Sequence, residues 1–327
     1  MIKKFIDLCA AENIFDGVRK VLIAVSGGAD SLALAELLKD SRRRFNLELA
    51  IAHFEHGLRG QDSIDDADFV KTFATERGIK FIGGSGDVKA FAATNKISVE
   101  TAARTLRYEF LSQVKADSNF DAIALAHHAD DQAETILMRL LRGAASEGLS
   151  AMKARTLSEE YGLLLRPLLK FRKVELENFC RVKNLSPRLD KTNFLPDATR
   201  NKIRLELIPT LKEFNPALVE TLCRLGEVTA QESDFISAQA QKIFPKVVKD
   251  NSIVRAEFLK LHPAIQRVVI KKFLAQVTGS VKDFGFVHFE GVRKVLLNNL
   301  AGVELPRNLR ANLRQGKLYI TQNLRKG

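Results

Sequence analysis

The chain has 327 residues, which suits two domains of ordinary size, each with its own hydrophobic core. Apolar residues make up 46% and charged residues 28% of it, as expected for a soluble globular protein. No apolar run approaches the ~20 residues that cross a membrane, so the composition excludes an integral membrane protein. The basic N-terminal stretch is interrupted by Asp7 and Glu12, which argues against a secretory signal.

The net charge of +12 is distributed unevenly along the chain. Residues 1–150 carry 19 Lys and Arg against 22 Asp and Glu, whereas residues 151–327 carry 32 against 17. A basic excess in one half is typical of a surface that binds a polyanion such as nucleic acid. Ordinary solvated Lys and Arg side chains remain the alternative.

The three cysteines, Cys9, Cys180 and Cys223, lie far apart and form no CxxC motif. Such usage predicts a reducing, cytoplasmic location and argues against a zinc or iron–sulfur site. We expect all three thiols to be buried and inert.

After a short amphipathic helix over residues 3–15, a strand and a glycine turn form the most informative stretch. Val21–Val25 is apolar without alternation, as in a strand buried on both faces of a parallel sheet. The turn Ser26–Gly28 follows, and Leu32–Leu38 is predicted to be helical. A strand, a glycine turn and a helix N-terminus together make an anion site, because backbone N–H groups and the helix dipole face the same point.

The residues of this turn suit a phosphate. Gly27 and Gly28 allow close approach of the backbone, and Ser26 and Ser31 add hydroxyl donors. A carboxylate beside a phosphate is repelled unless a cation lies between them, so Asp30 is predicted to be a Mg²⁺ ligand. A glycine turn without a ligand is the alternative.

The following elements alternate between strands and helices. His53 stands at the carboxyl end of the second strand, where ligands bind in doubly wound sheets. We therefore predict an α/β fold with a doubly wound, mainly parallel sheet. The expected strands cover residues 20–25, 47–53, 80–82, 121–126 and 162–165, and the expected helices cover residues 62–78, 98–111, 132–141 and 172–183.

The helix over residues 98–111 begins with Ser98 as a plausible N-cap. Arg104, Arg107 and Tyr108 fall near one face by the i, i+3, i+4 rule. From the spacing alone, a solvated helix face is the ordinary interpretation.

Two histidines and two acids, His127 to Asp131, follow the fourth central strand, where a helix begins. Asp131 and Glu134 are three residues apart, so they share a helix face and can converge on one Mg²⁺. His127 is placed to meet a phosphate or a proton in transit. Helix capping by Asp130 and Asp131 is the alternative, and clusters rich in histidine also bind zinc.

The second half contains prolines and basic clusters. Pro209 and Pro216 interrupt the helical pattern, and we place the domain boundary near residue 215. A long helix over residues 217–243 opens a smaller, α-rich, basic domain (216–327), which ends in a strand pair over 303–305 and 317–321.

Ser26–Ser31 resembles the SGGxDS signature of PP-loop ATP pyrophosphatases and differs from the P-loop pattern, which needs a lysine. Further motifs resemble those of the tRNA(Ile)-lysidine synthase family, in that family's order, over about the first two-thirds of the chain. They are His53–Arg59, Glu100–Arg104 with Arg107 and Tyr108, Ala126–Thr135, Arg166–Leu169, Asp190–Asn193 and Arg200–Arg204. The chain departs from the family at Phe54 and Glu55, where Val-Asn is usual.

The resemblance implies a fold of the adenine nucleotide alpha hydrolase type and a two-step reaction that uses ATP and Mg²⁺. The C2 oxygen of the wobble cytidine (position 34) in the CAU anticodon of tRNA(Ile) attacks the α-phosphate of ATP, and pyrophosphate leaves. Free L-lysine then displaces AMP to give lysidine. The resemblance also suggests a homodimer as one possible oligomeric state.

The resemblance also implies roles for individual residues. ATP would be held by Ser26, Gly27, Gly28, Ala29, Asp30, Ser31, His53 and Arg104. Catalysis would depend on Asp30, Arg107, His127, Asp131 and Glu134, with Asp30 and Asp131 on the metal. The tRNA would be held by Arg200, Asn201 and Arg204 together with the basic domain 216–327.

Two other functions are compatible with part of the pattern. A PP-loop enzyme of tRNA 2-thiolation would need paired cysteines, which the sequence lacks. A non-catalytic nucleotide sensor would bind ATP without releasing pyrophosphate and would have no use for Asp131 and Glu134.

Overall fold

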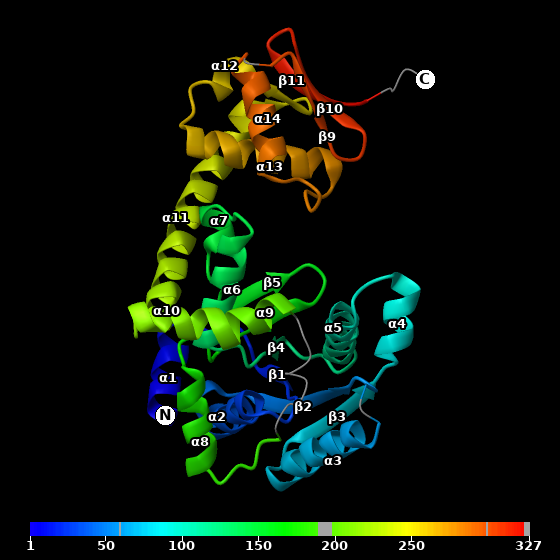
Figure 1. Cartoon of the computed structure of the whole chain (residues 1–327), viewed down its shortest axis with the longest axis vertical. Coiled ribbons are helices and arrows are strands. Elements are labelled where there is room, and N and C mark those ends of the chain that lie inside the picture. The colour runs from blue at the N-terminus through cyan, green and yellow to red at the C-terminus, as the bar shows by residue number, and fades with distance from the viewer. Residues whose placement is uncertain (59, 189–197, 299, 324–327) are drawn as a thin grey trace. The chain divides into compact units, whose positions relative to one another are not determined.

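A computed structural model describes residues 1–58, 60–188, 198–298 and 300–323. The chain forms two compact units, Met1–Glu227 and Val228–Gly327 (Figure 1). No helix in the described ranges is both long enough and apolar enough to span a bilayer.

The first unit is built on a six-stranded sheet. Its spatial order is β3-β2-β1-β4-β6-β5, and every neighbouring pair is parallel except β5 with β6. The mainly parallel sheet predicted from the sequence is therefore confirmed. The chain runs from β1 to β2 and β3 on one side of β1 and then crosses from β3 to β4 on the other side, so the carboxyl ends of β1 and β4 flank a topological switch point, where such sheets bind ligands. The strands are β1 (Lys20–Ala24), β2 (Glu48–Glu55), β3 (Lys80–Ser85), β4 (Ala122–Ala124), β5 (Arg155–Ser158) and β6 (Gly162–Leu165).

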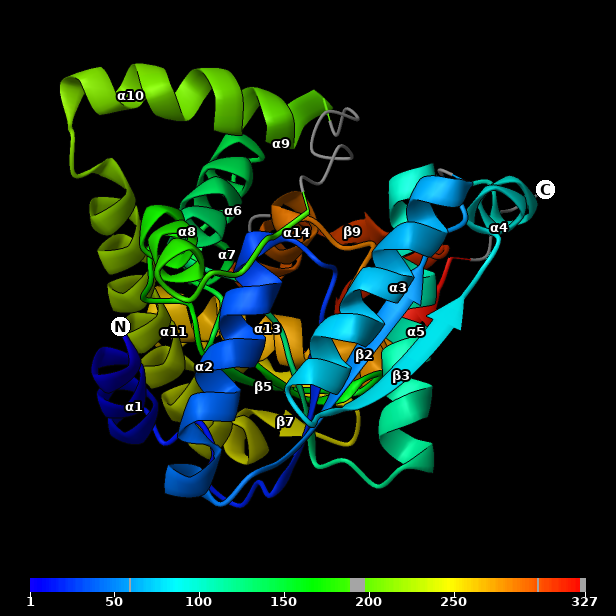
Figure 2. The same ribbon diagram turned by 90° about the horizontal axis from the view of Figure 1, so that it is seen from below.

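Helices cover both faces of this sheet, so successive residues of a strand are buried on opposite sides. Val21 and Ile23 of β1 pack in one core with helices α1, α2, α3 and α8, whereas Leu22 packs in a second core with α5. In Figure 2, α2 and α3 lie on the near side of the sheet. The helices of this unit are α1 (Ile2–Ala11), α2 (Ala29–Phe45), α3 (Gln61–Glu76), α4 (Val88–Asn95), α5 (Val99–Asp117), α6 (Ala129–Leu141), α7 (Ser146–Leu149), α8 (Lys173–Val182), α9 (Ala198–Lys202) and α10 (Ile208–Phe214), with a π-helical turn (Ile203–Leu207) between the last two.

The division between the units falls inside α11 (Leu218–Val247). Val219 and Leu222 in its first turns pack with Ala133 and Ile136 of α6, in a small apolar cluster of the first unit. The first compact unit ends at Glu227, and the domain boundary placed near residue 215 stays a prediction. That prediction rested on Pro209 and Pro216, which lie in the first turn of α10 and just before α11.

The second unit combines helices with an antiparallel sheet of order β7-β8-β11-β10-β9. The strands predicted over 303–305 and 317–321 are present as β9 and β11, but they are not paired with each other, because β10 lies between them. Phe258, Phe273 and Ile270 lie in the core of this unit. Its remaining elements are β7 (Val248–Lys249), β8 (Ser252–Val254), α12 (Arg255–Phe258), α13 (Pro263–Thr278), α14 (Phe286–Leu296), β9 (Gly302–Leu305), β10 (Leu309–Arg314) and β11 (Lys317–Gln322).

Candidate active site

The turn between β1 and α2 is held by its own hydroxyl groups. The Ser31 hydroxyl donates to the Gly28 carbonyl at 2.9 Å, and the Ser26 backbone N–H donates to the Ser31 oxygen at 3.2 Å. Gly27 has φ +94°, a conformation that L side chains rarely adopt. Gly28 is the N-cap of α2, so the first N–H groups of this helix open onto the turn without intrahelical acceptors. This geometry suits an anion such as phosphate.

We predict that Gly27→Ala weakens ATP binding by about tenfold or more. A side chain at positive φ costs about 1–2 kcal/mol, and the turn relieves this strain by leaving its phosphate-binding conformation. Gly17→Ala is the matched control, because Gly17 also has positive φ (+70°) but lies in an exposed turn before β1. Isothermal titration with ATP compares the two variants, and equal affinities would contradict this role of Gly27.

A cavity of about 420 Å³ opens beside the turn, at the carboxyl ends of β1, β2 and β4. Its apolar lining includes Ala24, Ala52, Phe54 and Leu125. The charged and polar lining includes Asp30, Arg107, His127, His128, Asp131 and Arg204. Apolar walls with a few convergent polar groups are typical of a small-molecule site of this volume.

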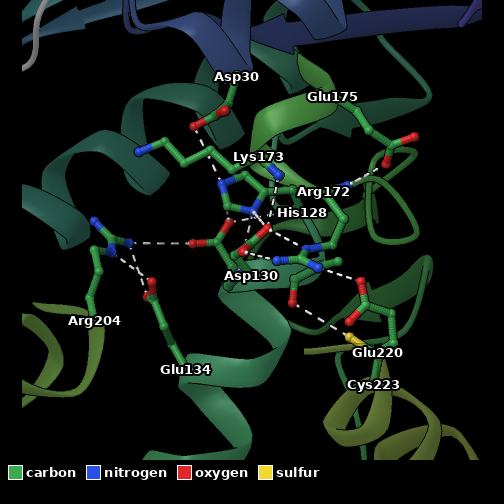
Figure 3. A network of polar contacts seen from close by, with 12 residues as sticks. Asp30, His128, Asp130, Glu134, Arg172, Lys173, Glu175, Arg204, Glu220 and Cys223 are labelled. Atoms are coloured by element: carbon green, nitrogen blue, oxygen red, sulfur yellow. Dashed lines mark hydrogen bonds and ion pairs between the residues drawn. The ribbon is translucent and has the colours of Figure 1, made fainter. Parts of the chain in front are cut away.

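His128 connects the turn to helix α6. Its Nε2 atom lies 3.4 Å from Oδ2 of Asp30 (Figure 3). The same atom lies 3.5 Å from Oδ2 of Asp131. It is also the N-cap of α6, because the Asp131 N–H meets its Nδ1 atom and its own N–H donates to Asp131 at 3.0 Å. Burial lowers the pKa of His128, but the hydrogen bond with Asp30 and the charge of Asp131 outweigh it and raise the pKa above its ordinary value. The sequence analysis placed this residue in the cluster of two histidines and two acids but gave it no role of its own, although its place three residues before Asp131 is that of a capping box.

The two neighbouring acids, Asp130 and Asp131, have different partners. Arg172 donates to Asp130 at 3.1 Å and the Lys173 N–H at 2.8 Å, so Asp130 fixes the start of α8 (Figure 3). Asp131 lines the cavity and completes the cap of α6. Burial raises the pKa of the Asp131 carboxyl.

Glu134 is almost fully buried and is paired with two arginines. Arg200 donates to it at 2.8 Å, and Arg204 donates through Nε at 2.6 Å (Figure 3 shows the second pair). Both guanidinium groups also lie within 3.7 Å of Asp131. The hydrogen bond with Glu134 raises the pKa of Arg204. Arg200 and Arg204, expected to contact tRNA, thus face the carboxylates of α6, and Asn201 lies between them on α9.

A recess of positive charge lies around His127. Arg104 and Arg107 have their guanidinium carbons 4.8 and 5.4 Å from the centre of the Tyr108 ring. Nδ1 of His127 and Nε of Arg107 are buried and meet no hydrogen-bond partner among the described residues, and both side chains line the cavity. Nε of Arg166 is likewise buried and has no hydrogen-bond partner among the described residues. Guanidinium N–H groups that are buried without acceptors favour an anionic ligand here.

Acidic pH should destabilise the protein through His127. Burial lowers its pKa well below the ordinary value, and the charges of Arg166 and Arg107 lower it further. Below about pH 6.5 the unfolded chain binds a proton on this ring that the folded chain does not, so stability falls as the pH falls.

We predict that the free energy of unfolding falls less steeply with falling pH in His127→Gln than in the parent. The difference in slope should reach up to about 1.4 kcal/mol per pH unit below 6.5. Urea unfolding at pH 5, 6 and 7 measures it. Parallel pH dependences in the parent and the variant would show that His127 titrates alike in both states.

His53 contacts the backbone just before the glycine turn. It is buried, and its Nδ1 atom lies 2.8 Å from the Val25 carbonyl. Burial lowers the pKa of His53, which keeps the ring neutral at this contact. Its contact is thus with the backbone before the turn, whereas the other residues expected at ATP, apart from Gly27 and Arg104, line the cavity.

The expected Mg²⁺ fits the carboxylates of the turn and of α6. Oδ1 of Asp30 is buried without a hydrogen-bond partner in the described chain, and His128 holds Asp30 and Asp131 on either side of one ring nitrogen. Mg²⁺ is usually held by one or two carboxylates together with substrate phosphates and water. No group of three or more Asp, Glu, His or Cys side chains is placed to hold a metal ion within the described ranges.

Two parts of the family motifs, Arg59 and Asp190–Asn193, lie outside the described residues.

Comparison with known proteins gives consistent matches. Residues 2–211 match the family described as "PP-loop domain". The chain is 36% identical over 296 residues to "tRNA(Ile)-lysidine synthase" of Clostridium perfringens, covering 89% of this chain and 62% of that protein. It is 32% identical to the protein of the same name from Clostridium acetobutylicum, covering 98% of this chain and 70% of the relative. The chain is thus shorter than these relatives.

A search of solved structures finds a "U34-tRNA thiolase NcsA from Methanococcus maripaludis with its [4Fe-4S] cluster". The TM-score is 0.59 at 19% identity, and the match covers 70% of this chain and 80% of that one. At this identity the likeness shows the fold alone.

Proposed function

Because this chain belongs to the tRNA(Ile)-lysidine synthase family of PP-loop proteins, we propose that it joins lysine to C2 of the wobble cytidine in the CAU anticodon of tRNA(Ile). The observation that carries the proposal is the cavity where the glycine turn, two facing carboxylates and the recess around His127 meet. We place the reaction in the cytoplasm, with ATP, Mg²⁺, free lysine and tRNA as reactants.

In the first step the turn Ser26–Ser31 holds the β- and γ-phosphates of ATP through backbone N–H groups and hydroxyls. The C2 oxygen of the cytidine bonds to the α-phosphorus, the bond to the bridging oxygen breaks, and pyrophosphate leaves. We assign Arg107 and His127, whose side chains line the cavity, to donate to the oxygens on which charge develops. Asp30 and Asp131 would hold Mg²⁺, which when bound would supply positive charge to offset that of the leaving pyrophosphate.

In the second step the ε-amine of lysine bonds to C2 and the bond between C2 and the AMP oxygen breaks. Glu134 holds the ε-ammonium before the attack and accepts the proton that it loses. The two guanidinium groups on Glu134 support this role, because they mark a buried carboxylate that binds cations. Arg200 and Arg204 must then release Glu134 in part when lysine enters.

The three cysteine thiols do not favour the alternative function of tRNA 2-thiolation. Burial raises the pKa of Cys9 to about 12 and that of Cys180 to about 11. The pKa of Cys223 is likewise raised, to about 11. All three therefore stay protonated near neutral pH, and sulfur transfer needs a thiolate.

Radiolabelled lysine tests the proposal directly. Label should enter a tRNA(Ile) transcript with a CAU anticodon only when ATP and Mg²⁺ are present, and it should not enter a transcript with a changed wobble base. Release of pyrophosphate without label would keep the adenylation chemistry but require another nucleophile. ATP binding with neither product would favour the nucleotide sensor.

A further inference from the structure

Lys173 brings a positive charge into the cavity from helix α8. It is the first residue of that helix, and its partly buried side chain lines the cavity. Figure 3 shows this side chain extending beside Asp30, the acid of the glycine turn. The ammonium group of Lys173 is therefore placed in the part of the cavity that adjoins the turn.

The charge of Lys173 is not neutralised by the surrounding protein. Lys170, in the turn before α8, pairs with Glu12 at 2.5 Å, and Arg188, in the cavity lining, pairs with Asp66 at 3.4 Å. The Lys173 ammonium group, in contrast, has no carboxylate within ion-pair distance in the described chain, although it lines the same cavity. A cation that faces a cavity without a counterion suits an anionic ligand.

The backbone that carries this side chain is fixed at both ends of α8. The Lys173 N–H donates to Asp130 at 2.8 Å, and the Arg172 guanidinium group donates to the same carboxylate at 3.1 Å. At the other end of α8, the Cys180 thiol donates to the Ala29 carbonyl at 3.4 Å, in the first turn of α2. These contacts hold the start of α8 against α6 and its end against the glycine turn, so the position of Lys173 is defined before a ligand binds.

Lys173 and Arg107 reach the cavity from opposite faces of the central sheet. Leu176 of α8 packs in the same core as α2, whereas Leu111 of α5 packs with Leu22 on the other face. Arg107 belongs to α5, and its buried Nε atom has no hydrogen-bond partner among the described residues. A chain of phosphates that crosses the carboxyl ends of the strands would meet one of these two cations on each side.

We propose that the Lys173 ammonium group binds the β- and γ-phosphates of ATP and the pyrophosphate that leaves, an inference that rests on the proposed function for the bond that breaks. The glycine turn leads into α2, which lies on the same face of the sheet as α8. This placement assigns the pyrophosphate group to Lys173 and the α-phosphate to Arg107.

The ammonium group acts on the charge that moves during the first step. When the bond between the α-phosphorus and the bridging oxygen breaks, its electron pair stays on that oxygen, so the pyrophosphate gains negative charge. A cation that is already in place stabilises this charge more strongly in the transition state than in bound ATP. Lys173 should therefore affect the rate of pyrophosphate release as well as the affinity for ATP.

The test is Lys173→Met in the full chain, which keeps the backbone N–H on Asp130 and removes the charge. Lys173→Arg keeps the charge. The matched control is Lys170→Met, because Lys170 is three residues away, pairs with Glu12 and does not line the cavity. Isothermal titration with Mg²⁺ present measures the affinity for ATP and for AMP, which lacks the β- and γ-phosphates. Far-UV circular dichroism and thermal unfolding verify that the variants are folded.

Lys173→Met should bind ATP at least about tenfold more weakly and AMP within about twofold of the parent, since one charge-assisted contact to the outer phosphates is lost. Its pyrophosphate release at saturating ATP should be about 100-fold slower, the loss typical when one preorganised donor is removed. Lys173→Arg should recover most of the affinity for ATP. Lys170→Met should match the parent with both nucleotides.

Two results would overturn the inference. Unchanged ATP affinity in Lys173→Met would show that the ammonium group does not contact the phosphates. Equal losses of ATP and AMP affinity would show that the substitution disturbs the whole site rather than a contact with the outer phosphates.

The same measurements separate the inference from the proposed function. If the parent does not incorporate lysine but Lys173→Met loses affinity for ATP and not for AMP, the function fails and the assignment of Lys173 stands. If the parent incorporates lysine and Lys173→Met binds ATP like the parent, the assignment fails and the function stands.

Discussion

Asp30→Asn should reduce pyrophosphate release at least about 100-fold, the loss typical when one preorganised electrostatic group is removed. The substitution keeps the shape of the side chain but removes the charge that would hold Mg²⁺ beside the phosphates and that faces Nε2 of His128 at 3.4 Å. Binding of tRNA should stay within a few-fold of the parent. Pyrophosphate release is followed with an enzyme-coupled phosphate assay in the presence of ATP, Mg²⁺ and tRNA.

Asp40→Asn is the matched control for this prediction. Asp40 lies on the same helix as Asp30, and its carboxylate pairs with Lys183 at 2.8 Å at the other end of α2. It should release pyrophosphate at the parental rate. A strong loss of tRNA binding in Asp30→Asn would count against placing Asp30 at the nucleotide.

Glu134→Gln should reduce lysine incorporation at least about 100-fold, again by the loss of one charged group in a buried site. The loss should be larger in lysine transfer than in pyrophosphate release, because we assign Glu134 to the second step. The variant should also lose about 1–3 kcal/mol of stability, since Arg200 and Arg204 keep their charges without the buried acceptor. Incorporation at several lysine concentrations separates a higher KM from a lower kcat.

Glu36→Gln provides the matched control. Glu36 on α2 is similarly buried and also accepts from two cations, Arg77 at 2.6 Å and Lys39 at 2.6 Å, away from the residues that line the cavity. It should lose comparable stability and keep its activity. If both variants lost activity to the same extent, the effect of Glu134 would be one of folding, and the lysine site would have to lie elsewhere.

Features that are local in sequence were predictable. The uninterrupted apolar run Val21–Val25 is typical of a strand in the middle of a parallel sheet, and the structure confirms it there as β1 and the residue after it. Gly27 and Ser31 likewise determine the turn through a positive φ and a local hydrogen bond. Such features depend on neighbours within a few residues, which a sequence displays directly.

Features that depend on distant residues were not predictable. The pairing of Glu134 with Arg200 joins residues 66 positions apart, and charge patterns alone do not show which partner an arginine selects. The role of His128 depends on Asp30, which arrives from a different strand-to-helix turn. Strand β10, in contrast, was predictable from the sequence but was not predicted. Leu309, Ala311 and Leu313 alternate with polar residues before the tight turn at Gln315 and Gly316.

The apolar cluster between α6 and the first turns of α11 determines where the chain can be truncated. A fragment that stops at residue 215 would lose Val219 and Leu222, and the buried side chains of Ala133 and Ile136 would face water. These two lie on the helix that presents Asp131 and Glu134, so the truncated protein would loosen at the carboxylates themselves. An autonomous N-terminal fragment therefore has to carry the chain through Glu227, with the first turns of α11 retained as part of its fold.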